Sequence, residues 1–395
     1  MPAQEIELAD DVDEYQYFLE KEWSDGFPVV APTEARLKWM LAGTRRDPDE
    51  VVGDIPPAGV TATVRDVALH ALMAGCKPDY LPVVLGAVQL MLREEFNLGG
   101  VQCTMHGVAP LMIVNGPYAS EIGLHGGNGC FGPGFRANAT IGRAIRLLLM
   151  NLGGGLAGLA SATVFASPIR YTACLTENTA LSPWETLAQS HGFSAGDNVI
   201  SCAMVESPRL CYDDASLTPE RLLTGLADSM SAMCSWNQHV RSDMVVAMGP
   251  EHATICAKAG MHRADVHAWL IKHAGRRVRD LKGGGNWRPE RARALNIDPE
   301  DDERFVPVIK DARDLHLIRQ AGVAERQADL GFVEDVGQLL GAQKRHGGDG
   351  DAAGFQDREP ARHHHWIVGG AQQHAIARLK AVVLDQNARD AVGAL

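Results

Sequence analysis

Gly249-Pro250-Glu251-His252 is the part of the sequence with the clearest potential for chemistry. Proline is favoured at the first helical position because its missing N–H would be unpaired there, so Glu251 and His252 are expected in a first helical turn. Free N–H groups and the positive end of the helix dipole lie at such a turn. An imidazole and a carboxylate placed there can transfer protons. In the alternative interpretation, Glu251 only complements the dipole and His252 packs against a loop.

A glycine-rich loop, His125 to Phe135, is the second candidate. Three of its glycines fit G-x-G-x-x-G, but they do not directly follow a strand, and no acidic residue follows at the distance typical of dinucleotide sites. We expect instead that the loop backbone approaches a ligand. Asn138 would then cap the next helix, and Arg136 would bind an anionic group of the substrate. An ordinary glycine-rich connection is the alternative.

Two cysteines in glycine-rich turns, Cys76 and Cys130, are candidate catalytic or redox thiols. A thiol beside Lys77, or near a helix N-terminus, has a lowered pKa and is nucleophilic. Lys77 is also a candidate substrate-binding residue. The alternative is that free cysteines are small buried hydrophobes, which we expect for Cys202, Cys211, Cys234 and Cys256. No H-E-x-x-H or C-x-x-C spacing occurs, so we predict no metal site.

The elements around these candidates predict an α/β fold. Apolar runs at residues 107–118, 171–178 and 243–248 are typical of buried strands. Asn115 lies near the end of the first run and Glu177 near the end of the second, so both are expected in one cleft at the strand ends, where open α/β sheets bind ligands. Asn115 and His106 are candidate substrate-binding residues, and Glu177 is a candidate catalytic residue.

Helices are predicted over residues 64–75, 138–152 and 262–275, beside these strands. We therefore predict a mixed or mostly parallel sheet with flanking helices. Residues 111–123 and 244–256 share one plan, an apolar strand followed by Gly-Pro and a helix start. This likeness predicts two similar half-domains, and chance similarity of a common turn is the alternative.

Three segments are expected along the chain. Residues 1–60 would form an N-terminal helical and extended arm, and residues 61–318 the α/β catalytic domain with halves 61–165 and 166–318. Residues 319–395 are polar and are expected to be poorly packed, except for a helix near 372–388. The composition of this last segment resembles GC-rich DNA read out of frame, and a polar regulatory tail is the alternative.

Composition excludes some classes of protein. The net charge of −12, with mixed signs, argues against a nucleic-acid partner. The apolar runs are too short or too interrupted to span a bilayer, and the N-terminus lacks a signal pattern. We therefore expect a cytoplasmic, non-membrane protein with its eight cysteines as thiols. A homo-oligomer is compatible with the sequence, and the cofactor is unknown from sequence.

Several long motifs carry a resemblance to a known family: DGFPVVAPTEARL, MAGCKPDYLPVVLGAV, PLMIVNGP, GCFGPGFRANATIGRAIRLLLMNLGG, YTACLTEN, SPWE and GPEHA. Over about residues 25–318 the chain resembles a bacterial family often encoded beside small proteins with a Cys-Gly-Ser-Cys or selenocysteine-Gly-Ser-Cys motif. The resemblance implies a two-component, thiol-dependent enzyme with a small thiol or selenol redox protein as partner, but it supplies no reaction. The chain departs from the family pattern after Ile318, where an apolar, glycine-rich strand and turn are expected.

We expect an enzyme acting on a small carbonyl- or carboxylate-bearing molecule, by thiol-dependent redox or by lyase or hydrolase chemistry. His252 with Glu251 would transfer protons, Arg136 would hold an anion, and Cys76 or Cys130 would act as the thiol. Two alternatives stay open. One is a non-catalytic subunit that binds a substrate or scaffolds the small thiol protein, and the other is a metal-dependent hydrolase.

Overall fold

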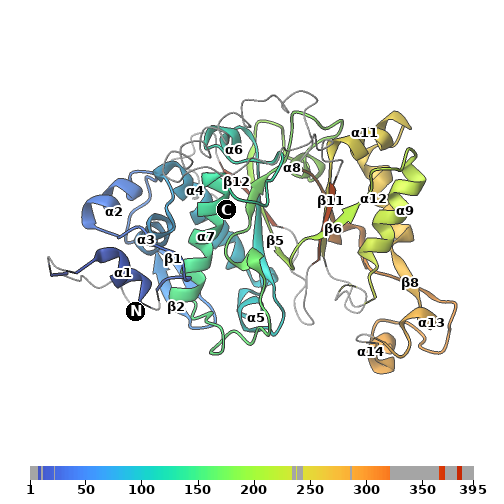
Figure 1. Ribbon diagram of the computed structural model, residues 1–395, viewed down its shortest axis with the longest axis horizontal. Helices are drawn as coiled ribbons and strands as arrows, with labels where there is room; N and C mark the ends of the chain where they lie inside the picture. Colours follow the sequence, from blue (N-terminus) through green and yellow to red (C-terminus); the bar gives the residue numbers. More distant parts are fainter. Residues whose placement is uncertain are drawn as a thin grey trace, which may run out of the picture.

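The computed structural model describes residues 8–9, 12–21, 23–233, 237, 243–284 and 287–320, with the backbone of two strands, 364–369 and 380–384. Two four-stranded sheets face each other, and helices cover the outer side of each sheet (Figure 1). The layers therefore run helices, sheet, sheet, helices. This arrangement confirms the predicted α/β fold with mixed sheets and flanking helices.

The first sheet has the order β12-β5-β3-β4. Its strands are β3 (Ala109–Asn115), β4 (Cys174–Thr176), β5 (Asn198–Val205) and β12 (Lys380–Leu384). The central strand β3 runs parallel to β4 and antiparallel to β5, which in turn runs antiparallel to β12. One parallel and two antiparallel pairs make this sheet mixed.

The second sheet repeats this pattern in the order β10-β7-β11-β6. Its strands are β6 (Arg209–Tyr212), β7 (Met244–Met248), β10 (Leu315–Arg319) and β11 (His364–Gly369). The strand β7 runs parallel to β10 and antiparallel to β11, and β11 runs antiparallel to β6. Thus β7, like β3, has one parallel and one antiparallel neighbour.

The similarity between residues 111–123 and 244–256 correctly identifies β3 and β7 as equivalent strands. It does not predict which face of the sheet each of their side chains lies on. Ile113 and Val245 both lie in the apolar core between the two sheets. Counted back from the Gly-Pro pair, Ile113 is third and Val245 is fourth. An offset of one residue reverses every face of a strand. The turns differ too, since φ is +105° at Gly116 and −64° at Gly249.

Four helices cover the first sheet: α3 (Val64–Ala74), α4 (Leu81–Met91), α5 (Leu98–Cys103) and α7 (Arg136–Asn151). Their apolar faces form one core with Met112 and Val114 of β3 and with side chains of β5. The helix α3 begins at a capping box, in which Thr63 and Asp66 bond each other's backbone N–H. The predicted helices over 64–75 and 138–152 are thus confirmed, the second starting two residues earlier.

The second sheet is covered by α9 (Pro219–Met230), α11 (Pro250–Lys258) and α12 (Arg263–His273), whose apolar faces pack on β7 and β10. The helix α12 confirms the prediction over 262–275. The smaller helices and strands are α1 (Glu14–Leu19), α2 (Glu34–Leu41), β1 (Val51–Ile55), β2 (Val60–Thr63), α6 (Pro117–Glu121), α8 (Leu187–Ser190), β8 (Gly275–Arg277), α13 (Val278–Leu281), α14 (Pro289–Ala294) and β9 (Phe305–Pro307). No helix in the described part of the chain is long and apolar enough to cross a membrane.

The segment boundaries differ from those expected. Met40 and Ile55, from the supposed arm, are fully buried in the core under the first sheet. The two sheets divide between β5 and β6, not at residues 165 and 166, because β4 and β5 both pair with β3. Two pieces of the supposed tail pair within the sheets as β11 and β12, so the expected helix is wrong at Lys380–Leu384. Arg319 and Gln320, the first two residues of the supposed tail, are buried at the end of β10, and the remainder of the tail lies outside the described residues.

Candidate functional site

Asn115, Glu177 and Arg319 meet where β3, β4 and β10 end. The Glu177 carboxylate accepts hydrogen bonds from Asn115 Nδ2 at 2.9 Å and from the backbone N–H groups of Leu187 at 2.7 Å and Arg319 at 3.1 Å. Arg319 Nε lies 3.5 Å from the same carboxylate. The structure therefore brings Asn115 and Glu177 together as the sequence suggested, and adds a partner that sequence reasoning missed.

This cluster is closed rather than open. The Glu177 side chain is fully buried and that of Arg319 is 5% exposed. Around it, Gln320 N–H donates to Met248 O at 3.1 Å, and Asn178 N–H donates to Arg319 O at 3.0 Å. The Asn178–Arg319 bond ties the end of the first sheet to the end of the second, whereas the Gln320–Met248 bond joins two strands of the second sheet. The geometry thus gives Glu177 a role in joining the sheets.

Glu251 and His252 lie in the first turn of α11, as predicted. Glu251 is half-buried, whereas the His252 ring is buried with Nε2 2.9 Å from Asp213 O. That contact matches the alternative in which His252 packs against a loop. Proton transfer by these two residues stays a prediction.

The two candidate thiols are buried, with Cys76 1% and Cys130 4% exposed. Burial raises the pKa of the Cys76 thiol to about 12, so the predicted lowering of its pKa is wrong. The neighbouring Lys77 is exposed on the surface, which leaves Cys76 in the apolar core. Among the described cysteines, Cys103 is the exposed one.

Arg136 and Asn138 hold loops in place. Arg136 donates twice to the Gly75 carbonyl, at 3.1 and 2.9 Å. Asn138 lies inside α7 and does not cap it; its side chain instead accepts from His125 N–H at 2.9 Å and donates to His125 O and Cys130 O. The capping role predicted for Asn138 is therefore wrong, because the helix already starts at Arg136. The glycine-rich loop is pinned to the side of α7.

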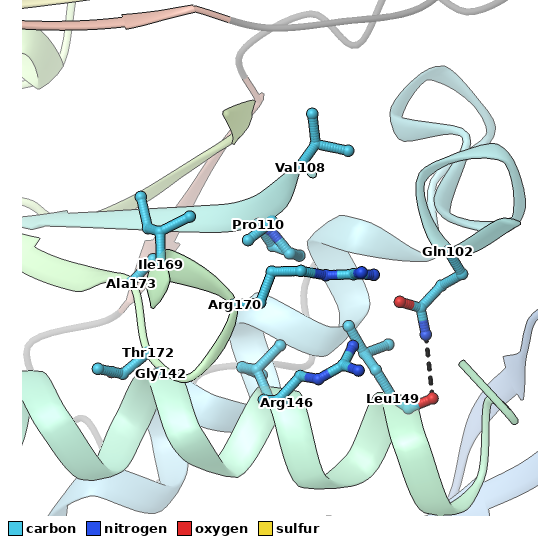
Figure 2. A pocket seen from close by; sticks show the side chains of 12 residues that line it. Gln102, Val108, Pro110, Gly142, Arg146, Leu149, Ile169, Arg170, Thr172 and Ala173 are labelled. Atoms are coloured by element: carbon cyan, nitrogen blue, oxygen red, sulfur yellow. Dashed lines mark hydrogen bonds between the residues drawn. The ribbon is translucent and has the colours of Figure 1, made fainter. Parts of the chain in front are cut away.

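A small pocket lies at the opposite, amino-terminal end of β3, between that strand and α7. Arg146 of α7 and Arg170, at the end of the short helix Pro168–Arg170, both extend into it (Figure 2). The remaining lining residues are largely apolar: Gln102, Val108, Ala109, Pro110, Gly142, Ile145, Leu149, Ile169, Thr172 and Ala173. Two cations thus share one largely apolar recess.

Neither guanidinium has an acidic partner within ion-pair distance among the described residues. Arg146 donates to Gly155 O at 3.1 Å, and Arg170 donates from both terminal nitrogens to Ser161 Oγ at 3.3 Å. Burial, and then the charge of Arg170, lowers the pKa of Arg146 to about 10, and burial also lowers the pKa of Arg170. A guanidinium stays protonated at neutral pH in proteins. The pocket therefore holds two positive charges that no carboxylate of the described residues pairs with directly, while the charge of Asp25, beyond ion-pair distance, raises the pKa of Arg146.

No protein-family model, curated protein or solved structure matches this chain. The residues and their geometry therefore carry the functional argument. The described residues also contain no group of three or more His, Cys, Asp or Glu side chains placed to hold a metal ion.

The predicted substrate-binding residue His106 lies near this pocket. It is two residues from the lining residue Val108, so their Cα atoms are at most about 7 Å apart. Its Nε2 contacts the carboxylate of Glu206, the residue after β5, and both side chains are part-exposed. An imidazole paired with a carboxylate is a proton-transfer group, and this pair lies at the same end of β3 as the arginines.

Sequence reasoning missed both arginines of the pocket. One available indication was the second arginine on an otherwise apolar face of α7, three residues after Arg143. Arg143 itself forms a bidentate pair with Asp25, at 2.8 and 2.7 Å. Nothing in the sequence shows that Arg146 lacks such a partner, since partners this far apart in sequence are set by the fold.

The buried histidine His70 predicts loss of stability in mild acid. Burial lowers the pKa of His70 below the usual 6.5. The unfolded chain therefore takes up a proton at a higher pH than the folded chain, so stability has its full value above pH 6.5 and falls as the pH drops below it. We expect the free energy of unfolding to fall by up to about 1.4 kcal/mol per pH unit for this histidine.

Urea unfolding at pH 7.5 and at pH 5.5 measures this effect. The His70→Gln variant should show a shallower pH dependence than the native chain. His273→Gln, at an exposed position, is the matched control and should not change the dependence. Equal stability of the native chain at both pH values would contradict the prediction.

Proposed function

We propose that this protein is an enzyme that binds a small carboxylate-bearing molecule between Arg146 and Arg170. The observation that carries the proposal is a pair of guanidinium groups, Arg170 buried and Arg146 half-buried, with no carboxylate within ion-pair distance among the described residues. Other strongly buried arginines differ, because Arg319 lies beside Glu177 and Arg263 lies 3.9 Å from Glu185. A buried charge without a partner is costly, and a bound anion would remove that cost.

The shape of the pocket favours a carboxylate over other anions. Guanidinium groups are planar forks that match the two oxygens of a carboxylate. Arg170 now contacts a neutral hydroxyl at 3.3 Å, which is a weak bond that an anionic oxygen would replace. The recess is small and largely apolar, which favours a compact headgroup such as a carboxylate.

For the chemical step, the His106–Glu206 pair is the proposed proton-transfer group. It replaces His252 and Glu251 in that role, because His252 is buried with its Nε2 against a backbone carbonyl. Lyase or hydrolase chemistry fits this pair. Redox chemistry with a small thiol or selenol protein stays part of the proposal, although the burial of Cys76 and Cys130 supports neither as the reactive thiol.

One observation favours a second candidate, a non-catalytic substrate-binding subunit. The residues that line the pocket include no carboxylate, imidazole or thiol. A subunit of this kind would bind the carboxylate as tightly as an enzyme and would leave it unchanged. Incubating the bound molecule with the protein and its gene neighbour, and then assaying for product, separates the two candidates.

Replacing Arg170 with glutamine should weaken carboxylate binding by roughly 10- to 100-fold, because charge-assisted hydrogen bonds are lost. Calorimetric titration with sodium acetate at constant ionic strength measures the affinity. The matched control is Arg313→Gln, which removes an exposed arginine on the surface and should leave the affinity unchanged. Unchanged binding in the Arg170→Gln variant, or no binding by the native chain, would refute the proposed site.

A further inference from the structure

Two chain segments, residues 102–105 and 155–164, run side by side from the pocket that holds Arg146 and Arg170. One begins at the loop whose Gly155 carbonyl and Ser161 hydroxyl accept from the two arginines. The other follows Gln102, a lining residue. Two backbone hydrogen bonds join them. Ala162 N–H donates to Cys103 O at 3.4 Å, and Val164 N–H donates to Met105 O at 3.2 Å.

These segments carry large apolar side chains that face solvent. The exposed fractions are 70% at Met105, 78% at Leu159, 67% at Val164 and 96% at Phe165. We call these four residues the apolar patch. Single exposed apolar residues are ordinary, whereas larger groups of them occur at binding surfaces. Val164 and Met105 are joined by a backbone hydrogen bond, which brings two of the four together. Val164 is three residues from Ser161, so their Cα atoms are at most about 10 Å apart.

The patch is held in a fixed position. A Cβ atom added at Gly107 would lie 2.8 Å from Ala166 O, so the two segments are in close contact there. Ala166 itself has a φ of +53°, a conformation that non-glycine residues adopt only when their surroundings enforce it. A preformed surface loses little conformational entropy on binding a ligand.

We infer that the natural ligand is a carboxylate with an apolar chain or ring, whose head lies between Arg146 and Arg170 and whose apolar part lies on the patch. This inference rests on the proposed function and names its substrate class. Leu159 lies in the loop between Gly155 and Ser161, the two residues that contact the arginines, so the apolar part of a molecule bound there is within reach of the patch. Covering apolar side chains with an apolar ligand is favourable in proportion to the area removed from water.

Titration with a series of carboxylates tests the inference. Affinity should rise about three- to fourfold for each methylene from acetate through butyrate and hexanoate to octanoate. 1-Octanol, which lacks the charged head, should not bind measurably. The double variant Val164→Ser, Phe165→Ser should flatten this rise while leaving acetate affinity unchanged. Both side chains are exposed, so the fold does not depend on them, and Leu217→Ser, at a position 86% exposed elsewhere, is the matched control.

The outcomes separate the two proposals. If acetate binds but longer chains bind no better, or if the double variant keeps the full rise, the inference is wrong and the carboxylate site stands. If no carboxylate binds, acetate included, the proposed function fails and the inference fails with it. If the double variant changes the oligomeric state in light scattering and keeps the rise, the patch is a contact between copies of the chain, which also overturns the inference.

Discussion

The Glu177→Ala variant is expected to lose about 3 to 5 kcal/mol of unfolding free energy, the usual cost of breaking a buried ion pair by removing one partner. Three donors then lose their acceptor together: Asn115 Nδ2, Leu187 N–H and Arg319 N–H. The Arg319 guanidinium also loses its counter-charge. Because the side chain is fully buried, bulk solvent does not reach these groups in the native structure. Urea unfolding followed by circular dichroism measures the change.

Two controls make this prediction specific. Glu177→Gln keeps an acceptor oxygen and the shape of the side chain, so its loss should be smaller than that of the alanine variant. Glu34→Ala changes an exposed residue in the first turn of α2 and should alter stability by at most about 1 kcal/mol. A loss below 1 kcal/mol for Glu177→Ala would show that the carboxylate does not join the sheets.

Replacing Arg170 with methionine is expected to have the opposite sign, raising the unfolding free energy by about 1 to 4 kcal/mol. The side chain is 9% exposed and faces a second guanidinium rather than a carboxylate. Methionine fills much of the same space and removes both the desolvated charge and its repulsion with Arg146. Carboxylate binding should disappear in the same variant. Residues kept for binding are often those whose removal stabilises a protein.

Arg319→Met is the matched comparison for this second prediction. Both arginines are strongly buried, but Arg319 lies beside Glu177, so its removal leaves a buried carboxylate without its cation. We expect Arg319→Met to destabilise the fold by several kcal/mol. If Arg170→Met also destabilised it by more than 1 kcal/mol, Arg170 would be a structural residue, and the carboxylate site would lose its main support.

Local patterns in the sequence predicted much of the fold. The capping Thr63, the periodic apolar faces of α3 and α12, and the run ending at Asn115 all act over a few residues, and the structure confirms each element. Contacts between distant segments were not predictable in this way. Arg319, one of the partners of Glu177, lies 142 residues away in the sequence. The likeness of the two Gly-Pro turns located the central strands, yet it could not show that their faces are offset by one residue.

The errors at the candidate site have a common physical origin. Lys77 adjoins Cys76 in sequence, which suggested an electropositive setting for the thiol. In the fold the lysine is exposed and the thiol enters the apolar core, so burial determines its pKa. Arg146 and Arg170 were overlooked for a related reason. They are proposed as ligand-binding residues because no acidic residue of the described chain pairs with them, and the lack of such a partner is visible only in the fold.

The bond between Glu177 and Arg319 also sets a time order during synthesis. A ribosome adds roughly 5 to 20 residues per second, so Arg319 is synthesised on the order of 10 s after Glu177, which precedes it by 142 residues. During that interval the first sheet can begin to pair while its inner face has no opposing layer. The nascent chain is therefore expected to need a chaperone while its second half is translated, and slower elongation over that half would lengthen the vulnerable period.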